Sequence, residues 1–431
     1  MTYERIVCLD DLTRDEFWPA KEFIYDLVRA PILFASGLSI AHSPRRGRSH
    51  NLVDGFDVQR FLELAGGDAG THWASGYHQL PPAAHAYLVE AIPKGTLVIG
   101  YEMTPALKKV LAEAGCDHVD IRVSPLRFGA DLYVGLSTNS PDIYRRIVPL
   151  AMHEHEVVAE ACLMAAQVRY RRRYTPDAPR WDDALVWVGQ TRQDASLLGN
   201  DGRFLRAADA APAIREAAQG RRLVYKAHPY AGPFGREEHA QLARITGQEI
   251  ALCELDAYEL LAMDDNLSLI GISSSLLQEA SYFGKAASWF RHPECTPDFG
   301  FAGPGQGHLH VATNVFLSEA LWAAILGLPA RAQSLCLPPR PNHLRELHNA
   351  WWGYSTLQLR HSNFHREAVQ LHAPAPAAAP PRDDSQLQQA LALERQRVDD
   401  LRLEVEGLKE ALRVVLRHAT PRTAADLAAA A

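Results

Sequence analysis

Residue types that could do chemistry cluster in the stretch VWVGQTRQDAS, residues 186 to 196. Its apolar start predicts a buried strand that ends at Gly189, where a loop begins. The loop then supplies an amide, a carboxylate and a hydroxyl within eight residues: Gln190, Asp194 and Ser196. A carboxylate at a strand end raises the question of its role, and Asp194 can serve simply as the cap of a helix that begins at Ala195.

A second polar cluster is KAHP, residues 226 to 229, at the end of another apolar run. Lys226 and His228 are two residues apart, so on an extended strand their side chains share one face and can contact a single anion. Taken alone, the same four residues also fit an ordinary turn beside a surface lysine.

Three consecutive serines begin a predicted helix in ISSSLLQEASYFG, residues 272 to 284, and Gly284 can end that helix: the serines are Ser273, Ser274 and Ser275. Serines at a helix start are common caps. Their hydroxyls, together with the free backbone N–H groups and the positive end of a helix, also form a phosphate site. Glu279 lies about one turn into the helix and can hydrogen-bond a ribose. We therefore expect a nucleotide phosphate as the ligand.

Metal chemistry is not expected from the histidines. HEHE at 153 to 156 lacks the spacing of a zinc helix, because Val157 stands four residues after His153. His308 and His310 in GHLH have no nearby set of cysteines or carboxylates, so we predict polar surface or core groups. GPGQG at 303 to 307 lacks the following Lys and Ser/Thr of a phosphate-binding P-loop, and we predict an ordinary loop.

The three motifs GQTRQDAS, KAHP and SSSLLQEA, in this order at the ends of successive predicted strands, resemble one family. They are similar to those of the retaining β-Kdo glycosyltransferases of bacterial capsule and O-antigen assembly, which transfer the acidic eight-carbon sugar Kdo from CMP-Kdo. The resemblance is closest over residues 184 to 285. It is looser over the first domain, where IGYEMTP and DIRVSPLRFGADLYVGLSTN look like the acceptor-side half of the O-antigen type, and it does not cover the chain from about 371.

The resemblance implies a double displacement, in which a carboxylate attacks the anomeric carbon, CMP leaves, and the acceptor hydroxyl then displaces the carboxylate with net retention. Asp194 matches the position of that nucleophile. Gln190 and Ser196 would then orient Asp194 or contact the sugar. The departing CMP carries its developing charge on one phosphate, so protein donors can replace a divalent cation. The donors available are Lys226, His228 and Ser273 to Ser275, and neither a metal nor a cofactor is expected.

Deprotonation of the acceptor needs a base on the other side of the cleft. We expect Glu102, at the end of the run TLVIGY, or else Asp120. Either acid could instead pair with Arg122 or Arg127, and one of these arginines could receive the Kdo carboxylate.

These motifs must be positioned by elements that alternate between short apolar runs and helical patterns. Runs at 31 to 36, 96 to 102, 118 to 123 and 131 to 137 predict the parallel strands of a first α/β domain. A second set at 184 to 189, 222 to 229, 267 to 275 and 286 to 293 predicts another, and ligands bind beyond the carboxyl ends of such strands. The expected fold is α/β, with two Rossmann-like domains facing a cleft as in the two-domain GT-B glycosyltransferases.

The expected organisation has six parts. They are an acceptor-side α/β domain at 1–150, a helical linker at 151–180, a CMP-sugar-binding α/β domain at 181–335, a helical return segment at 336–370, a Pro/Ala linker at 371–383 and a coiled coil at 384–417. In the last part, eight of nine seam positions from Leu387 to Val415 are apolar and follow alternating steps of four and three. The pattern favours a two-stranded coiled coil, with a trimer or a single packed helix as alternatives.

Composition limits the classes of function. With 431 residues the chain is expected to form two domains, and its net charge of -7 argues against a broad nucleic-acid surface. Six cysteines without CxxC spacing, and a start unlike a signal peptide, predict reduced thiols in the cytoplasm. No apolar run approaches the roughly 20 residues of a membrane helix, so we expect at most peripheral association with the inner membrane.

The sequence therefore predicts a metal-independent retaining β-Kdo transferase that acts on a lipid-linked glycan and forms a homo-oligomer, or binds a partner, through the coiled coil. A sialyltransferase or another CMP-sugar transferase is one alternative. A non-catalytic glycan-binding scaffold, in which the coiled coil is the working part, is a second. The acceptor sugar and its linkage are not predicted.

Overall fold

The structure is a computed structural model that describes residues 3–9, 11–13, 22–40, 56–66, 73–172, 180–329 and 336–351. All of these residues belong to one compact unit, Met1–His372. The predicted Pro/Ala linker and coiled coil, and most of the helical return segment, lie outside the described residues.

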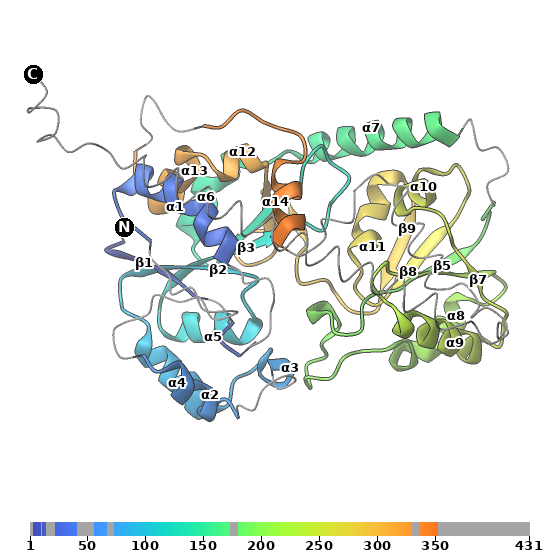
Figure 1. The fold of residues 1–431 in the computed structure, drawn as a ribbon, viewed down its shortest axis with the longest axis horizontal. Coiled ribbons are helices and arrows are strands. Elements are labelled where there is room, and N and C mark those ends of the chain that lie inside the picture. The colour runs from blue at the N-terminus through green and yellow to red at the C-terminus, as the bar shows by residue number, and fades with distance from the viewer. Residues whose placement is uncertain are drawn as a thin grey trace, which may run out of the picture. The chain divides into compact units, whose positions relative to one another are not determined.

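The first sheet is mixed and has the strand order β1-β2-β3-β4-β11-β10 (Figure 1). Its strands are β1 (Arg5–Cys8), β2 (Thr96–Tyr101), β3 (Asp117–Val123), β4 (Val134–Thr138), β10 (Pro297–Asp298) and β11 (His308–Val311). The first three strands pair in parallel, whereas β4 is antiparallel to both β3 and β11. The sheet is thus mixed: among its described strands β4 runs opposite to its neighbours, while β10 and β11 again pair in parallel.

Helices cover both faces of this sheet, which explains the continuous apolar run of β2. Leu97, Ile99 and Tyr101 face a core shared with α1 (Glu22–Ser36), α6 (Pro141–Ile147) and α13 (Glu319–Leu326). Val98 faces the opposite core, formed with α2 (Val58–Leu64), α4 (Pro82–Ala91) and α5 (Pro105–Glu113). Every side chain of the strand is therefore buried, as expected for a strand covered on both faces.

The second sheet contains five parallel strands in the order β7-β6-β5-β8-β9. They are β5 (Leu185–Val188), β6 (Leu223–Lys226), β7 (Ala251–Leu252), β8 (Ser268–Gly271) and β9 (Ala286–Trp289). The order reverses between β5 and β8, which is the switch point at which doubly wound sheets bind ligands. The four predicted strands of this region are confirmed, and so is the α/β class.

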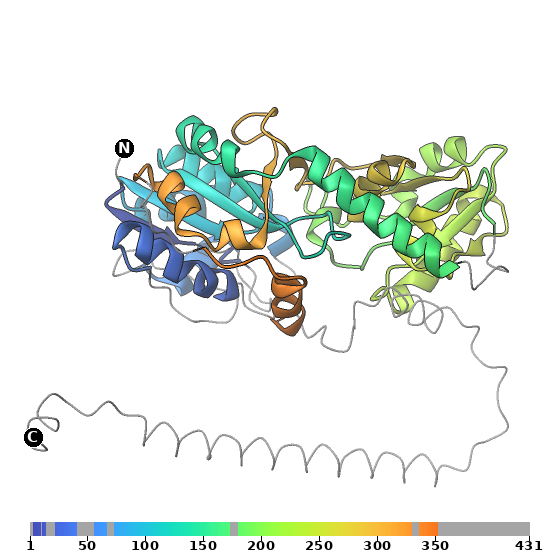
Figure 2. The same ribbon diagram turned by 90° about the horizontal axis from the view of Figure 1, so that it is seen from above.

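Two pairs of helices sandwich the second sheet. α8 (Ala211–Ala217) and α9 (Pro233–Thr246) pack on the face that carries Trp187. α10 (Ala257–Ala262) and α11 (Ser275–Ala280) pack on the face that carries Val186 and Val188. The long α7 (Glu154–Arg172), predicted from residues 151–173, joins the parts of the chain that carry the two sheets (Figure 2).

One predicted strand was wrong. The run PILFAS at 31 to 36 belongs to α1, because its buried residues continue a helical series rather than an alternating one. Tyr25, Val28, Ile32 and Ala35 are buried at steps of three or four, whereas Phe34 is 47% exposed. The strand was predicted from the short apolar run, and such a run does not by itself distinguish a strand from a segment of a buried helix.

Two features of the first sheet also differ from the prediction. The run 131–137 does form β4, but antiparallel to β3, so the first sheet is not purely parallel. The segment 297–329, predicted within the CMP-sugar domain at 181–335, returns to the first sheet as β10, β11, α12 (Thr313–Phe316) and α13. The reason is packing, since Leu309, Val311 and Trp322 are buried in the first core.

No helix within the described ranges is long and apolar enough to cross a bilayer.

Candidate functional site

A cavity of about 500 Å³ gathers the predicted chemical groups of both sheets. Loops after β5, β6 and β8 contribute Gln190, Asp194, Ser196, His228, Ser273, Ser274 and Ser275. The opposite wall follows β2 and β3 and contributes Glu102, Arg122 and Arg127. The structure therefore brings together most of the residues singled out in the sequence.

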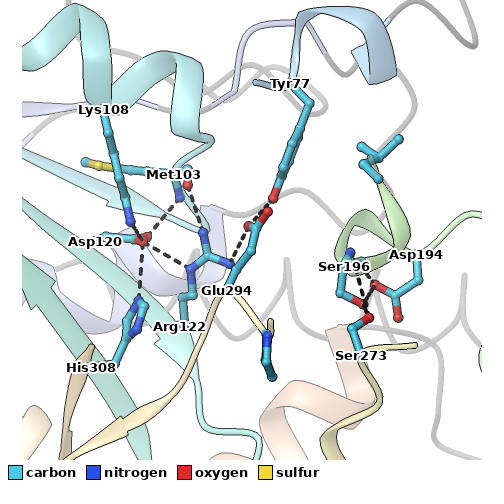
Figure 3. A network of polar contacts seen from close by, with 12 residues as sticks. Tyr77, Met103, Lys108, Asp120, Arg122, Asp194, Ser196, Ser273, Glu294 and His308 are labelled. Carbon is cyan, nitrogen blue, oxygen red and sulfur yellow. Dashed lines mark hydrogen bonds and ion pairs between the residues drawn. The ribbon is translucent and has the colours of Figure 1, made fainter. Parts of the chain in front are cut away.

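Asp194 is held by one carboxyl oxygen. Its Oδ1 accepts hydrogen bonds from the backbone N–H and the hydroxyl of Ser196, both at 2.9 Å (Figure 3). Its Oδ2 accepts no hydrogen bond from any residue of the described ranges. Asp194 does cap a short 3-10 helix, Ala195–Leu197, yet the cap uses only Oδ1. Capping and a chemical role are therefore compatible, because the second oxygen is left for a ligand.

Gln190 fixes this arrangement by bridging the ends of β5 and β8. Its Nε2 donates to Ser196 Oγ at 3.0 Å and lies 3.2 Å from Ser273 Oγ, while its Oε1 accepts from the Ser273 backbone N–H at 3.0 Å. Gln190 is buried, and Ser273 Oγ contacts Ser196 Oγ at 2.9 Å. Of the two roles expected for Gln190, orienting Asp194 through Ser196 is the one that these contacts favour.

His228 lies on this cavity and on a neighbouring one of about 570 Å³, which Lys226 also lines. Burial lowers the pKa of His228 to about 4, although Asp194 opposes the shift. The imidazole is therefore neutral near pH 7. Its Nδ1 accepts the Tyr230 backbone N–H at 3.1 Å, so the ring proton sits on Nε2, where it can be donated to an anionic oxygen.

Lys226 lines the larger cavity together with His228, but its ammonium is partly committed. Lys226 is buried and donates to the carbonyl of Leu255. An ammonium group has three donors, so it can still meet an anion in the cavity that it lines.

The serine segment lies on both cavities through Ser274 and Ser275. Ser274 is the N-cap of α11, but its hydroxyl makes no capping hydrogen bond. The helix spans six residues before a 3-10 turn that ends at Gly284, so its dipole contributes less than the sequence suggested. The hydroxyls themselves are the stronger candidates for ligand donors.

Glu279 has a structural role, because it holds two neighbouring groups by hydrogen bonds. It is buried, and its Oε1 accepts the Arg127 backbone N–H at 2.6 Å and the Tyr258 hydroxyl at 3.0 Å. Burial raises the pKa of Glu279 to about 7, against the effect of these hydrogen bonds. Glu279 also lines the larger cavity, so its expected contact with a ribose stays a prediction.

The raised pKa of Glu279 predicts how stability depends on pH. A carboxyl group whose pKa is higher in the folded than in the unfolded chain makes folding less favourable as pH rises, here from about 4.5 to about 7. Glu279→Gln removes this penalty while keeping the acceptor oxygen. We expect its stability relative to the wild type to rise by on the order of 2 kcal/mol between pH 5 and pH 8. Urea unfolding at both pH values measures this, and parallel pH curves for the two proteins would contradict it.

Glu102 stands where β2 ends and is held in an unusual conformation. Its φ is 53°, in the left-handed region that costs energy for residues other than glycine. Its backbone N–H donates to Ile121 O at 2.9 Å, and its carboxylate accepts no hydrogen bond within the described part of the chain. A strained backbone that presents a free carboxylate to the cavity fits the base expected at this position.

Asp120, the alternative base, does not fit. It has no exposed surface and is surrounded by Lys108 at 2.6 Å, Arg122 at 3.0 Å and His308 at 3.4 Å (Figure 3). Burial alone would raise the pKa of Asp120, but these cations and the His308 hydrogen bond hold it well below its usual range. Asp120 also accepts the Met103 backbone N–H at 2.9 Å. It is therefore a buried anion that organises the wall and cannot meet an acceptor.

Arg122 and Arg127 differ in whether the guanidinium group is already paired. Arg122 pairs with Asp120, donates to Met103 O at 2.8 Å and lies 3.5 Å from Glu294, so its guanidinium is engaged on every side. The guanidinium of Arg127 forms no ion pair or hydrogen bond with the described residues and lines both cavities. Its backbone is fixed by Glu279 and by Arg345, which donates to Arg127 O at 2.9 Å. Arg127 is the available cation.

Glu294 is a cavity residue that the sequence analysis missed. It accepts a hydrogen bond from the Tyr77 hydroxyl and faces Arg122 on the wall that follows β2 and β3 (Figure 3). The sequence does contain a signal for it, because Glu294 comes directly after FRHP, the residues that end a predicted strand.

No group of three histidines, cysteines or acidic residues in the described part of the chain is arranged to hold a metal ion. His308 and His310 are buried in the first sheet, so of the two environments predicted for them, polar surface or core, the structure shows the core. Metal independence itself stays a prediction.

No family model matches the chain, and no curated protein matches it. Two solved structures from Thermosulfurimonas dismutans are similar to it. The KpsC β-Kdo 2,7 transferase is 15% identical with a TM-score of 0.33, over 63% of this chain and 90% of that chain. The KpsC β-Kdo 2,4 transferase is 15% identical with a TM-score of 0.30, over 61% and 88%.

Proposed function

We propose that this chain is a retaining glycosyltransferase that moves β-Kdo from CMP-Kdo to a lipid-linked polysaccharide through a covalent sugar on Asp194. One observation carries the proposal: Asp194 is anchored by Oδ1 alone, in a cavity that it shares with His228 and Glu102. The choice of CMP-Kdo as donor rests on the motifs GQTRQDAS, KAHP and SSSLLQEA. The GT-B arrangement of the two halves is part of the same proposal.

In the first step, Oδ2 of Asp194 attacks the anomeric carbon and the bond from that carbon to the CMP phosphate oxygen breaks. The neutral His228 donates a hydrogen bond through Nε2 to the departing phosphate, and Lys226 and the serine hydroxyls offer further donors. In the second step, Glu102 takes the proton of an acceptor hydroxyl, whose oxygen displaces Asp194 from the sugar. Two inversions at one carbon give net retention.

Incubation of the protein with CMP-Kdo and a metal chelator tests the proposal. We expect release of CMP and an increase of the intact mass by one sugar residue. Turnover of CMP-sialic acid instead would indicate another CMP-sugar transferase. Failure to bind CMP in calorimetry would favour a non-catalytic glycan-binding scaffold. Action at the inner membrane and assembly through the C-terminal heptads remain predictions.

Arg127 is proposed to bind the donor carboxylate, because it is the cation of the cavities that the described residues leave unpaired. Arg127→Gln should raise the KM for CMP-Kdo about 10-fold or more, since a charged hydrogen bond contributes roughly 1.5–3 kcal/mol. The affinity for CMP, which lacks the carboxylate, should change little. Kinetics with CMP-Kdo and calorimetry with CMP measure the two effects, and an equal loss with both ligands would assign Arg127 to the phosphate.

A further inference from the structure

The loop that carries Asp194 has a second support, which comes from the acceptor-side half of the chain. This support is α3 (Trp73–Gly76), together with Tyr77 and His78 that follow it. A small apolar core joins the helix to the loop and consists of buried Ala74, Tyr77 and Leu198, with Trp73, Ala195 and Phe204 packed against them. Ala195 directly follows Asp194, so this core fixes the neighbour of the proposed nucleophile.

The loop that carries Asp194 is cross-linked within itself and to α3. Its backbone is cross-linked by hydrogen bonds from Gly199 N to Arg203 O and from Leu205 N to Leu197 O, both at 2.8 Å. An antiparallel bridge pairs Leu198 with Phe204, whose ring meets Trp73 edge-on at 5.7 Å. A shift at the loop tip therefore reaches the short helix that Asp194 caps.

Gly202 at the loop tip makes the contact with α3 possible. Its φ is 76°, and a Cβ built there would lie 2.9 Å from Ser75 Cα and 3.0 Å from Ala74 O. Both are backbone atoms, which cannot rotate away, so a side chain at this position would push α3 from the loop. Gly220 has a similar φ of 70°, but a Cβ there would meet nothing within 4 Å.

α3 also reaches the acceptor-side wall. The Tyr77 hydroxyl donates to Glu294, and Tyr77 lines the cavity. His78 Nε2 lies 3.3 Å from Leu198 O. One short segment thus contacts both the wall that is proposed to face the acceptor and the loop that carries Asp194.

We propose that α3 positions the nucleophile, and that Gly202 is a positioning residue because it allows the close approach of the two backbones. The catalytic consequence rests on the proposed function, since it requires Asp194 to attack the donor. The support of the loop by α3 does not depend on any activity.

The test compares Gly202→Ala with Gly220→Ala, two substitutions at similar left-handed backbone angles. Gly202→Ala should make the loop amides of Gly199 and Leu205 exchange with deuterium about 10-fold faster or more. It should slow the single-turnover formation of the sugar adduct about 100-fold, because a displacement near 1 Å has effects of that size. CMP affinity should stay within about 2-fold, since the donors of the larger cavity lie elsewhere. Gly220→Ala should match the wild type in all three measurements.

Tyr77→Phe separates packing from hydrogen bonding. It keeps the ring in the small core but removes the hydrogen bond to Glu294, so exchange in the loop should stay as in the wild type. If the loop amides of Tyr77→Phe exchanged as fast as those of Gly202→Ala, packing would not be what holds the loop.

Two other results would overturn the proposal: loop exchange in Gly202→Ala equal to that in Gly220→Ala, or loss of CMP binding in Gly202→Ala, which would mean general damage to the fold. Failure of the proposed function has a different signature. The wild type would then form no adduct with CMP-Kdo, while the exchange difference between the two glycine variants would persist.

Discussion

Asp194→Asn should lower sugar transfer by at least about 1,000-fold while CMP still binds. Asparagine keeps the size of the side chain and an oxygen that can accept the Ser196 hydrogen bonds, so the cap of Ala195–Leu197 survives. What it lacks is the anionic Oδ2 that must attack the anomeric carbon. Steady-state kinetics with CMP-Kdo and calorimetry with CMP measure the two expectations.

Asp201→Asn is the matched control for this substitution. Asp201 lies on the same loop and, like Asp194, accepts a backbone N–H two residues later, from Arg203 at 3.1 Å. It is exposed and does not line either cavity. Turnover should survive in this variant. Near-normal turnover in Asp194→Asn would reduce Asp194 to a helix cap and end the double-displacement assignment.

The second sheet could be predicted from the sequence because each strand carries its own signal. The runs of β5, β6, β8 and β9 are apolar, short and followed by polar or turn residues, so each run predicts both a strand and candidate site residues beyond it. Parallel pairing then brings the strand ends to one edge. This is why Asp194, His228 and Ser273 to Ser275 meet although up to 81 residues separate them in the sequence.

The first sheet was harder to predict, because some of its helices and strands have similar apolar patterns. α1 is apolar around much of its circumference near Pro31, so a six-residue window could not distinguish it from a strand. β10 is only two residues long, too short for any periodicity. That the chain returns to this sheet after residue 297 depends on long-range packing, which no local pattern encodes.

Some residues of the candidate site can likewise be predicted from local sequence, and others cannot. Asp194 and His228 are found from residue type and strand position, whereas the choice among Glu102, Asp120 and Glu294 depends on burial and pairing. Asp120 and Arg122 are two residues apart on β3 and share one face. The sequence could therefore predict their pairing as an alternative to a base role for Asp120. Nothing local in the sequence shows that Lys108 and His308 enclose the same carboxylate.

Glu102→Gln should make the covalent sugar accumulate in the presence of acceptor. The substituted amide side chain has the same size and starts from the same strained backbone position, but it cannot take the proton of the acceptor hydroxyl. The second displacement should slow about 100-fold or more, the usual contribution of a general base, while the first step needs no base and continues. Quenched-flow sampling and intact mass should show a largely unmodified wild type and a largely modified variant.

Peptide mapping then decides which carboxylates are involved. The sugar should lie on the peptide that contains Asp194, since only this acid of the cavity combines a fixed Oδ1 with a free Oδ2 at the end of a strand of the second sheet. Glu294→Gln is the rival variant, because Glu294 faces the same cavity but is already bonded to Tyr77 and Arg122. Accumulation in Glu294→Gln and not in Glu102→Gln would transfer the base role to Glu294. An adduct on any other peptide would remove Asp194 from the mechanism, because a nucleophile must carry the sugar between the two steps.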